Sequence, residues 1–324
     1  MALIKSIIIL IIGFALLMKG ADYFVEGSSS VAKQLHVPSM IIGMTIVAMG
    51  TSLPECAVSV TASLTGNNSL AVSNVVGSNI FNLMVVCGAC ALFAPLTIKK
   101  DTLKKEFPLS IICAALLMVL GYVGMLLGHL DGGVFLLIFA AYLIWMIGSA
   151  KKARAAHKES QMMLEEGELV DEEIQILPLW KCALFIVGGM IAIKFGGDFV
   201  VDSASTLASA FGLSQTLIGL TIVAMGTSLP ELVTSIVAAR KNEVDMAVGN
   251  AVGSNIFNIL MVLGIASAIN PVALIRENII DIVILIVFSL IVWIYAATKR
   301  KISRKEGISM VCLYLIYAGY IIWR

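Results

Sequence analysis

An eleven-residue segment occurs twice in this 324-residue chain. The letters Thr-Ile-Val-Ala-Met-Gly-Thr-Ser-Leu-Pro-Glu occupy residues 45–55 and recur without a change at 221–231. A second segment, Gly-Ser-Asn-Ile-Phe-Asn, occupies 77–82 and recurs at 253–258, again 176 residues further on. The register between the two copies holds without a gap over a long stretch. The chain is therefore predicted to consist of two homologous halves that share one fold.

The composition indicates that these halves lie in a membrane and not in water. Hydrophobic residues make up 59% of the chain, charged residues only 13%, and the mean hydropathy is +0.99. Ordinary globular proteins carry about 25% charged residues, so a soluble enzyme is excluded. The apolar runs, such as 6–18 and 279–297, are continuous, whereas the strands of a membrane β-barrel alternate in polarity. We expect an all-α polytopic membrane protein.

Ten membrane spans are predicted, five in each half, at about 20 apolar residues per span. Their approximate ranges are 4–30, 38–66, 70–94, 107–128 and 132–150, then 179–208, 214–239, 246–270, 278–298 and 308–323. The chain divides into a first repeat at 1–150, a linker loop at 151–178 and a second repeat at 179–324.

The odd number of spans per half determines their relative orientation. A half with five spans ends on the opposite side of the membrane, so its homologous copy must cross in the opposite sense, as in many secondary transporters. Basic residues concentrate on one side, in the clusters at 99–105, 151–158 and 299–305. Because such residues mark the cytoplasmic side, we expect the linker loop in the cytoplasm and both termini outside a plasma membrane.

The polar features outside the repeated segments have simpler explanations. The loop at 151–178 starts basic and turns acidic at 165–173, but it lacks the glycine-centred spacing of a calcium loop. Acids near the ends of the first and sixth spans, such as Asp22 and Asp198, predict a salt-bridged stripe near the membrane interface.

Several ligand and partner classes are excluded on composition. A net charge of +1 predicts no nucleic-acid partner. The six cysteines lie in or beside apolar runs, and Cys87-x-x-Cys90 has no second ligand pair, so we expect packing rather than a disulfide framework or a zinc site. We expect no cofactor, and a monomer suffices for the predicted site.

Two carboxylates, Glu55 and Glu231, lie within apolar spans. An ionisable group at that depth costs at least about 2.5 kcal/mol and indicates function. Each follows Gly-Thr-Ser-Leu-Pro, where proline removes a backbone donor and glycine permits non-helical geometry. The second and seventh helices should therefore break beside the carboxylates. A broken helix frees carbonyl oxygens, which are tolerated in a membrane only within protein or along a cavity.

Hydroxyls and amides add neutral oxygens to these carboxylates. The hydroxyls at the breaks are Thr51, Ser52, Thr227 and Ser228, and the next span of each half supplies Ser78 with Asn82, or Ser254 with Asn258. The last two pairs have a four-residue spacing that places both members on one helix face, with Asn74 and Asn250 one turn earlier. Such an all-oxygen site suits hard cations such as Ca²⁺ and Na⁺. The three histidines are near loops and are not expected to be ligands.

Packing is the alternative explanation for some of the small and amide residues. Glycine allows close helix contact in membranes, and asparagine can hydrogen-bond across helices. This explanation remains open for Gly77, Asn79, Gly253 and Asn255. It does not account for an eleven-residue identity that ends in an intramembrane carboxylate.

The duplicated Gly-Thr-Ser-Leu-Pro-Glu and Gly-Ser-Asn-Ile-Phe-Asn segments resemble the α-repeats of the calcium/cation antiporter superfamily, specifically its prokaryotic sodium/calcium exchanger branch. The resemblance covers essentially the whole chain. It implies exchange of Na⁺ for Ca²⁺ by alternating access, with the first and sixth spans sliding against the other eight. The ligands that it implies are the carboxylates of Glu55 and Glu231, the hydroxyls of Thr51, Thr227, Ser78 and Ser254, and the carbonyls of Ala48 and Ala224.

One departure from the family pattern bears on the coupling ion. Some members carry an acid at one of the positions occupied here by Asn82 and Asn258, and potassium-dependent relatives rely on it. The two asparagines in this chain weaken the case for potassium coupling. Exchange of H⁺ for Ca²⁺ ranks lower still, because the repeats of the proton/calcium exchangers have a different sequence. A cation channel would use the same oxygens. An intramembrane enzyme is the weakest alternative, because the chain has no H-E-x-x-H motif.

Overall fold

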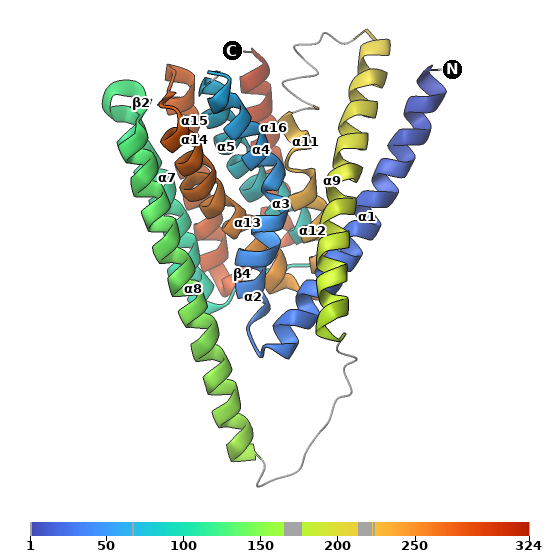
Figure 1. The fold of residues 1–324 in the computed structure, drawn as a ribbon, viewed down its shortest axis with the longest axis vertical. Coiled ribbons are helices and arrows are strands. Elements are labelled where there is room, and N and C mark those ends of the chain that lie inside the picture. The colour runs from blue at the N-terminus through green and yellow to red at the C-terminus, as the bar shows by residue number, and fades with distance from the viewer. Residues whose placement is uncertain (1, 67, 165–176, 213–221, 223, 324) are drawn as a thin grey trace.

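The structure is a computed structural model that describes residues 2–66, 68–164, 177–212, 222 and 224–323. The described chain is mostly helical (Figure 1). The acidic run at 165–173 and the beginning of the predicted seventh span at 214–221 lie outside the described residues.

The first half has a second span that is divided into several short helical pieces instead of one continuous helix. Its elements are α1 (Ala2–Gln34), α2 (Ser39–Ile42), the π-helical turn η1 (Gly43–Val47), α3 (Ala48–Thr51), α4 (Leu53–Leu64), α5 (Asn68–Phe81), the π-helical turn η2 (Asn82–Val86), α6 (Cys87–Phe93), β1 (Leu96–Thr97), the π-helical turn η3 (Thr102–Glu106), α7 (Phe107–Tyr122), the 3₁₀ turn η4 (Val123–Met125), β2 (Leu126–Leu127) and α8 (His129–Leu164).

The second half repeats this order at corresponding positions. Its elements are α9 (Leu179–Ala210), α11 (Ala224–Gly226), α12 (Leu229–Arg240), α13 (Val244–Phe257), the π-helical turn η6 (Asn258–Leu263), α14 (Gly264–Ile269), β3 (Val272–Ala273), α15 (Arg276–Ala297), the 3₁₀ turn η7 (Thr298–Arg300), β4 (Lys301–Ile302) and α16 (Arg304–Trp323).

The helices are long and apolar enough to cross a membrane. Within the described residues, eight helices meet that requirement, and the bent pair Ser39–Thr51 and Leu53–Leu64 raises the number to as many as nine. The two members of this pair are inclined at 48° to each other. The membrane class and the break in the second helix therefore agree with the sequence analysis.

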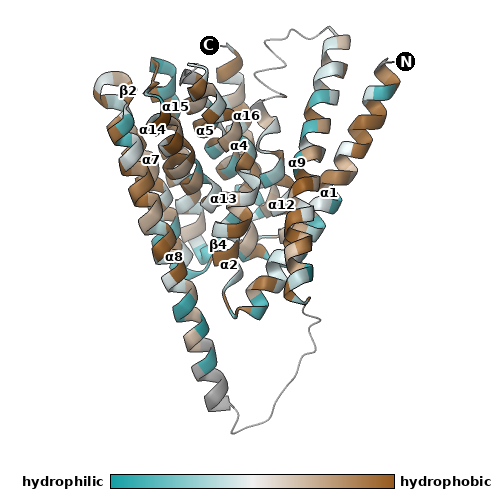
Figure 2. Ribbon diagram, in the orientation of Figure 1, coloured by the Kyte–Doolittle hydropathy of each residue, from teal (hydrophilic) through white to brown (hydrophobic). Residues whose placement is uncertain are grey.

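Helix α8 extends further than the sequence analysis predicts. The apolar run ends near residue 150, where the linker loop was expected to begin, but the helix continues to Leu164. Residues 151–164 are rich in Lys, Ala, Arg, Glu and Met, which are strong helix formers with or without a membrane around them. This lower part of α8 projects beyond the other helices and is largely hydrophilic (Figures 1 and 2).

The centre of the bundle is formed by the third span of each half. The spans at Leu70–Phe93 and Val244–Ile269 are 78% buried, whereas the other long helices are at most 39% buried. The outer helices α1 and α9 are rich in apolar residues (Figure 2), and many of these, such as Ile11 and Leu184, are exposed. Apolar residues therefore face lipid, and the buried serine, threonine and asparagine side chains lie inside.

The homologous first helices of the two halves, α1 and α9, cross closely and run antiparallel (Figure 1). A Cβ atom on Gly13 would lie 3.0 Å from the carbonyl oxygen of Gly196, and one on Gly20 would lie 3.0 Å from that of Gly189. Gly189 corresponds to Gly13 and Gly196 to Gly20 under the 176-residue offset. The contact is therefore reciprocal between the two copies.

Two short antiparallel pairings also join the halves reciprocally. Strand β1 pairs with β4, with Leu96 opposite Ile302, and β2 pairs with β3, with Leu127 opposite Val272. The two pairings lie at opposite ends of the bundle (Figure 1). They hold corresponding corners of the two halves together.

We expect Gly189→Ala to destabilise the bundle and the adjacent Gly188→Ala to leave it unchanged. A Cβ on Gly189 would lie 2.7 Å from the oxygen of Gly20 and 2.8 Å from the nitrogen of Phe24, while nothing lies within 4 Å of a Cβ on Gly188. Overpacking of this kind costs about 1–3 kcal/mol. Thermal unfolding of the detergent-purified variants measures the difference, and equal midpoints would contradict the close crossing.

Candidate functional site

The helix breaks position the two intramembrane carboxylates. Ser52 has φ −84° and ψ 9° between α3 and α4, and Ser228 has φ −93° and ψ 4° before α12. A proline occupies the first turn of each following helix. Glu55 and Glu231 therefore lie in the first turns of α4 and α12, where the helix dipole favours negative charge.

The serine at each break bonds to the carboxylate of the other half. Ser52 Oγ donates to Glu231 Oε1 at 2.9 Å, and Ser228 Oγ donates to Glu55 Oε1 at 3.1 Å. A serine at a helix N-cap ordinarily bonds to the backbone of its own helix, but neither of these makes a side-chain cap. The two serines instead tie the two breaks to each other.

Ser78 and Asn258 from the central spans join the same network. Ser78 Oγ donates to Glu55 Oε1 at 3.1 Å and lies 2.9 Å from Ser228 Oγ. The Asn258 amide donates to Asn79 Oδ1 at 3.1 Å and lies 3.4 Å from Ser78 Oγ. The network thus joins α4, α5, the α12 break and η6 around Glu55.

Asn74 and Asn250 hold the broken helices against the central spans. The Asn74 amide lies 3.0 Å from Ser59 Oγ and 3.3 Å from the backbone oxygen of Glu55. Its counterpart Asn250 makes the equivalent contacts with Ser235 Oγ at 2.9 Å and the backbone oxygen of Glu231 at 3.4 Å. These two amides fix the backbone of the turns that carry the carboxylates.

Thr51 extends this support on one side. Its hydroxyl lies 3.1 Å from Asn250 Oδ1 and 3.1 Å from the backbone oxygen of Val47. The first break is thereby linked to the central span of the second half.

Asn79 and Asn255 cross-link the two central spans. The Asn79 amide donates to the Asn255 backbone oxygen at 3.1 Å, and the Asn255 amide donates to the Asn79 backbone oxygen at 3.2 Å. The pair is reciprocal under the 176-residue offset. The packing explanation left open for these residues agrees with this geometry, although Asn79 also supports Asn258.

Several buried oxygens around the breaks have no hydrogen-bond partner within the described residues. Among them are Glu55 Oε2, Glu231 Oε2, Asn82 Oδ1, Asn258 Oδ1, Thr227 Oγ1 and Ser254 Oγ. A buried oxygen left unpaired costs about 1–3 kcal/mol. These six oxygens come from both halves and belong to residues that the sequence predicts as ligands. The unpaired Thr234 Oγ1, three residues after Glu231, was not predicted.

The charge of the carboxylates is also uncompensated. Glu55 and Glu231 are fully buried, and neither forms an ion pair with the basic residues that the structure describes. Buried charges are normally paired or bound to a metal. Two carboxylates with neutral oxygens around them fit a cation with oxygen ligands.

No third acid is needed for this chemistry. Within the described residues, no group of three or more His, Cys, Asp and Glu side chains is placed to hold a metal. A soft transition metal, which prefers nitrogen or sulfur ligands, therefore has no matching donor set in that part of the chain.

The backbone carbonyls differ in part from the sequence-based expectation. The Ala48 oxygen, expected to be freed by the break, accepts a bond from the Ser52 N–H at 3.0 Å. The Thr51 hydroxyl also lies 3.4 Å from this oxygen, so a ligand at the second lone pair of the carbonyl would compete with that hydroxyl. Ala224, its counterpart, begins α11.

Two structural features were not anticipated from the sequence. The π-helical turns η2 and η6 begin at Asn82 and Asn258, and such turns occur frequently at functional sites. The supporting hydroxyls Ser59 and Ser235 were also missed. Their equivalence under the offset, each four residues after a carboxylate, is the signal that could have identified them.

Comparison with known proteins gives a consistent result. The profile of a family described as "Sodium/calcium exchanger protein" matches residues 5–148 and 181–323. The inner membrane protein YrbG of Escherichia coli is 36% identical over 97% of this chain and 94% of its own length. The sodium/calcium exchanger MaX1 of Methanosarcina acetivorans is 32% identical over 96% of this chain and 97% of its own length.

Solved structures of a sodium-calcium exchanger, NCX_Mj, have the same fold. One of them, soaked with 2.5 mM Na⁺ and 10 mM Sr²⁺, superposes with a TM-score of 0.82 at 30% identity and covers 98% of this chain and 99% of the other.

We expect Asn79→Ala to cost more stability than its counterpart substitution Asn255→Ala. Both remove one amide bond between the central spans, but Asn79→Ala also leaves the Asn258 amide without its 3.1 Å acceptor. Asn255 Oδ1 receives no bond within the described residues. The extra loss should be about 1 kcal/mol, measured by thermal unfolding. Equal losses would show that the Asn79–Asn258 contact contributes nothing.

Proposed function

This chain belongs to the sodium/calcium exchanger family, and on that premise we propose that it exchanges Na⁺ for Ca²⁺ at the site between its two broken helices. The observation that carries the proposal is the set of unpaired buried oxygens from both halves beside Glu55 and Glu231. Those oxygens are ligands that a hard cation would complete. The family is one of transporters rather than enzymes.

The proposed ligand set follows the duplicated segments. It consists of the Glu55 and Glu231 carboxylates, the Thr51, Thr227, Ser78 and Ser254 hydroxyls, the Asn82 and Asn258 amide oxygens, and the Ala48 and Ala224 carbonyls, with Ser52 and Ser228 orienting the carboxylates. Support comes from the crossed serine–carboxylate bonds, which make the two carboxylates part of one network.

Charge balance explains how two ions can compete for this site. Two ionised carboxylates carry a charge of −2, which one Ca²⁺ or two Na⁺ would neutralise. A third Na⁺ would leave the site positive, so a cycle of three Na⁺ per Ca²⁺ would move net charge across the membrane. We infer that Na⁺ and Ca²⁺ share the two carboxylates and cannot both fill the site.

We further propose ten membrane helices in two inverted repeats, with a broken seventh helix matching the second. The reciprocal contacts support this arrangement. The antiparallel α1 and α9 and the Asn79–Asn255 pair relate the halves by the same offset, and the two strand pairings do so to within one residue. Inverted repeats of broken helices favour alternating access over a permanently open channel.

A cavity beside α9 supports access to the site from one side. One part, about 380 Å³, is lined by Thr51, Pro54 and Pro230, and another, about 310 Å³, reaches Thr227. Both parts also contact α9 at Lys194. From the distribution of basic residues, we propose that the clusters at 99–105, 151–158 and 299–305 lie on the cytoplasmic side of a plasma membrane and that both termini lie on the extracellular side.

Coupling to K⁺ or H⁺ remains the alternative mode of exchange. The asparagines at 82 and 258 argue against potassium coupling, because potassium-dependent relatives place an acid at one of these positions. The site lies within one chain, so a monomer suffices for it.

We expect an outward Na⁺ gradient to drive ⁴⁵Ca²⁺ into vesicles that contain the purified protein. The shared site couples departure of Na⁺ to entry of Ca²⁺. The measurement is initial uptake under separately imposed Na⁺, K⁺ and H⁺ gradients. Uptake that ignores the Na⁺ gradient and follows the pH gradient would refute sodium coupling, and uptake that needs no counter-ion would indicate a channel.

Glu55→Gln and Glu231→Gln should each abolish this uptake without unfolding the protein. Either change removes one of the two buried charges while keeping the shape of the side chain and its acceptor oxygen. Glu277→Gln, which neutralises an exposed acid in the first turn of α15, is the matched control and should transport normally. Retained exchange in either site variant would disprove the assignment.

A further inference from the structure

We propose that Lys241 is a positioning residue of the exchange cycle: it fastens α1 to the end of α12 and so favours the conformation that opens beside α9. Lys241 lies at the end of α12 opposite to the first turn that carries Glu231, and it is not a member of the proposed ligand set. The inference rests on the proposed alternating access, because it concerns the balance between the two conformations rather than ion binding itself.

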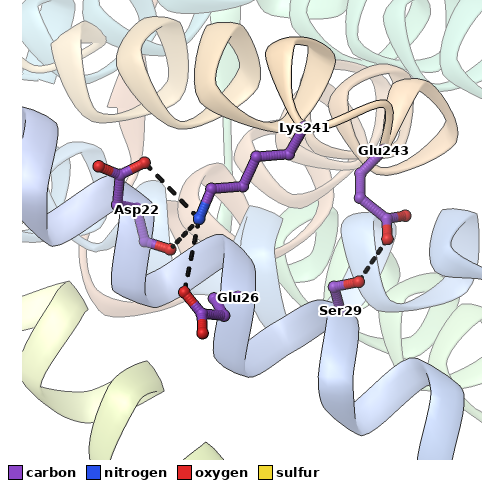
Figure 3. Close-up of polar contacts among 5 residues, drawn as sticks. All are labelled: Asp22, Glu26, Ser29, Lys241 and Glu243. Carbon is purple, nitrogen blue, oxygen red and sulfur yellow. Dashed lines mark hydrogen bonds and ion pairs between the residues drawn. The ribbon is translucent and has the colours of Figure 1, made fainter. Parts of the chain in front are cut away.

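Three acceptors on α1 converge on the Lys241 ammonium group (Figure 3). Its Nζ lies 3.6 Å from Asp22 Oδ1, 3.6 Å from Glu26 Oε2 and 3.0 Å from the Asp22 backbone oxygen. Asp22 and Glu26 are one helical turn apart and therefore share a face of α1. Lys241 directly follows the last residue of α12, where a positive charge is favoured by the helix dipole.

A second contact next to Lys241 strengthens the same junction. Glu243 accepts a hydrogen bond from Ser29 of α1 and lies 3.9 Å from Lys33 Nζ. Figure 3 shows the two contacts side by side along α1. The turn after α12 thus contacts α1 along about three helical turns, from Asp22 to Lys33.

The packing beneath these bonds is closed. Ala21 and Val25, which lie on the same stretch of α1, are fully buried, and α1 contacts α12 directly. This stretch of α1 is therefore tightly packed against the bundle.

The corresponding junction in the other half is open. Under the 176-residue offset, Asp22, Glu26 and Val25 correspond to Asp198, Asp202 and Val201 of α9. These three residues line the 310 Å³ cavity that separates α9 from Pro54, Ala57 and Val58 of α4. The structure is thus closed where α1 meets α12 and open where α9 faces α4.

The open junction also lacks the lysine. The position that corresponds to Lys241 is Thr65, whose hydroxyl bonds within its own helix. Asp198 pairs instead with Lys194 on α9 itself, at 2.5 Å. Ser205, the counterpart of Ser29, has no partner for its hydroxyl within the described residues. When the open junction closes in the other half of the cycle, no lysine is present at position 65 to hold it.

An exposed ion pair stabilises a conformation by about 0.2–1 kcal/mol. The three acceptors around the Lys241 ammonium group form a small network of such contacts. Loss of the contact should therefore change the ratio of the two conformations by up to about five-fold. A change of this size alters the share of time spent open on each side without preventing transport.

The test uses a single reporter cysteine, Ala57→Cys, in a background without the six native cysteines. Ala57 lines the cavity between α4 and α9 and is reached by a membrane-impermeant maleimide only when this side is open. Lys241→Thr, which copies the residue at position 65, should slow labelling by up to about five-fold. Lys241→Arg keeps the charge and should label as the parent does.

Two further variants keep the test decisive. Asp22→Asn with Glu26→Gln removes the acceptors and should slow labelling equally, even if Lys241→Thr does not reach the membrane. Lys105→Thr is the matched control, because within the described residues this lysine forms its ion pair with Asp101 of the same helix segment. That control should label at the parental rate.

The reciprocal variant Thr65→Lys tests the one-sided nature of the contact. A lysine there would meet Asp198 and Asp202 when the cavity closes, so labelling should slow. An unchanged rate in this variant would overturn the one-sided explanation, and unchanged rates in both Lys241→Thr and the Asp22/Glu26 double variant would overturn the contact itself.

Sodium-driven ⁴⁵Ca²⁺ uptake in the same vesicles separates this inference from the proposed function. All of these variants should retain uptake. Absent uptake in the parent protein would count against the proposed exchange, whereas intact uptake with insensitive labelling would refute only the role of Lys241.

Discussion

The structure depends on two buried carboxylates that have no basic partner in the described part of the chain. A membrane interior cannot hold such charges without compensation, so the surrounding elements supply neutral donors on one side of each carboxylate and leave the other side free. Ser52 and Ser228 donate to one oxygen of the carboxylate from the opposite half, and the second oxygen of each remains unpaired. The free oxygens define where a cation would complete the site.

The crossed bonds also explain why the helices must break. A continuous helix would use the backbone donors at the centre of the span and would not present a carboxylate in its first turn at that depth. Proline and serine at each break interrupt the helix and place Glu55 and Glu231 in the first turns of α4 and α12. Asn74 and Asn250 then hold these turns against the central helices.

Symmetry between the halves is close at the site and imperfect at the periphery. Reciprocal contacts occur at the α1–α9 crossing and in the Asn79–Asn255 pair. The junction of α1 with α12 is closed and salt-bridged, whereas the junction of α9 with α4 contains a cavity. An antiporter that works by alternating access needs this combination. Its two related junctions must be able to exchange roles, so that one is closed while the other is open.

The sequence by itself determined the membrane class, the duplication and the broken second helix, because apolar runs and Pro/Gly breaks are local properties. It also singled out Glu55, Glu231 and their neighbouring hydroxyls, since an acid within an apolar span is conspicuous without any contact information. Only the tertiary structure decided which serine bonds which carboxylate, that Ala48 keeps a backbone bond, and that Lys241 reaches Asp22 and Glu26. The serine–carboxylate and Lys241 contacts join residues 173 to 219 positions apart, whose distance depends on how the two halves pack, whereas the Ala48 bond depends on the local geometry of the break. The continuation of α8 to Leu164 could be predicted only in part. The sequence contains helix-forming residues there, but the apolar pattern that marks the end of a membrane span does not show whether the helix continues into water.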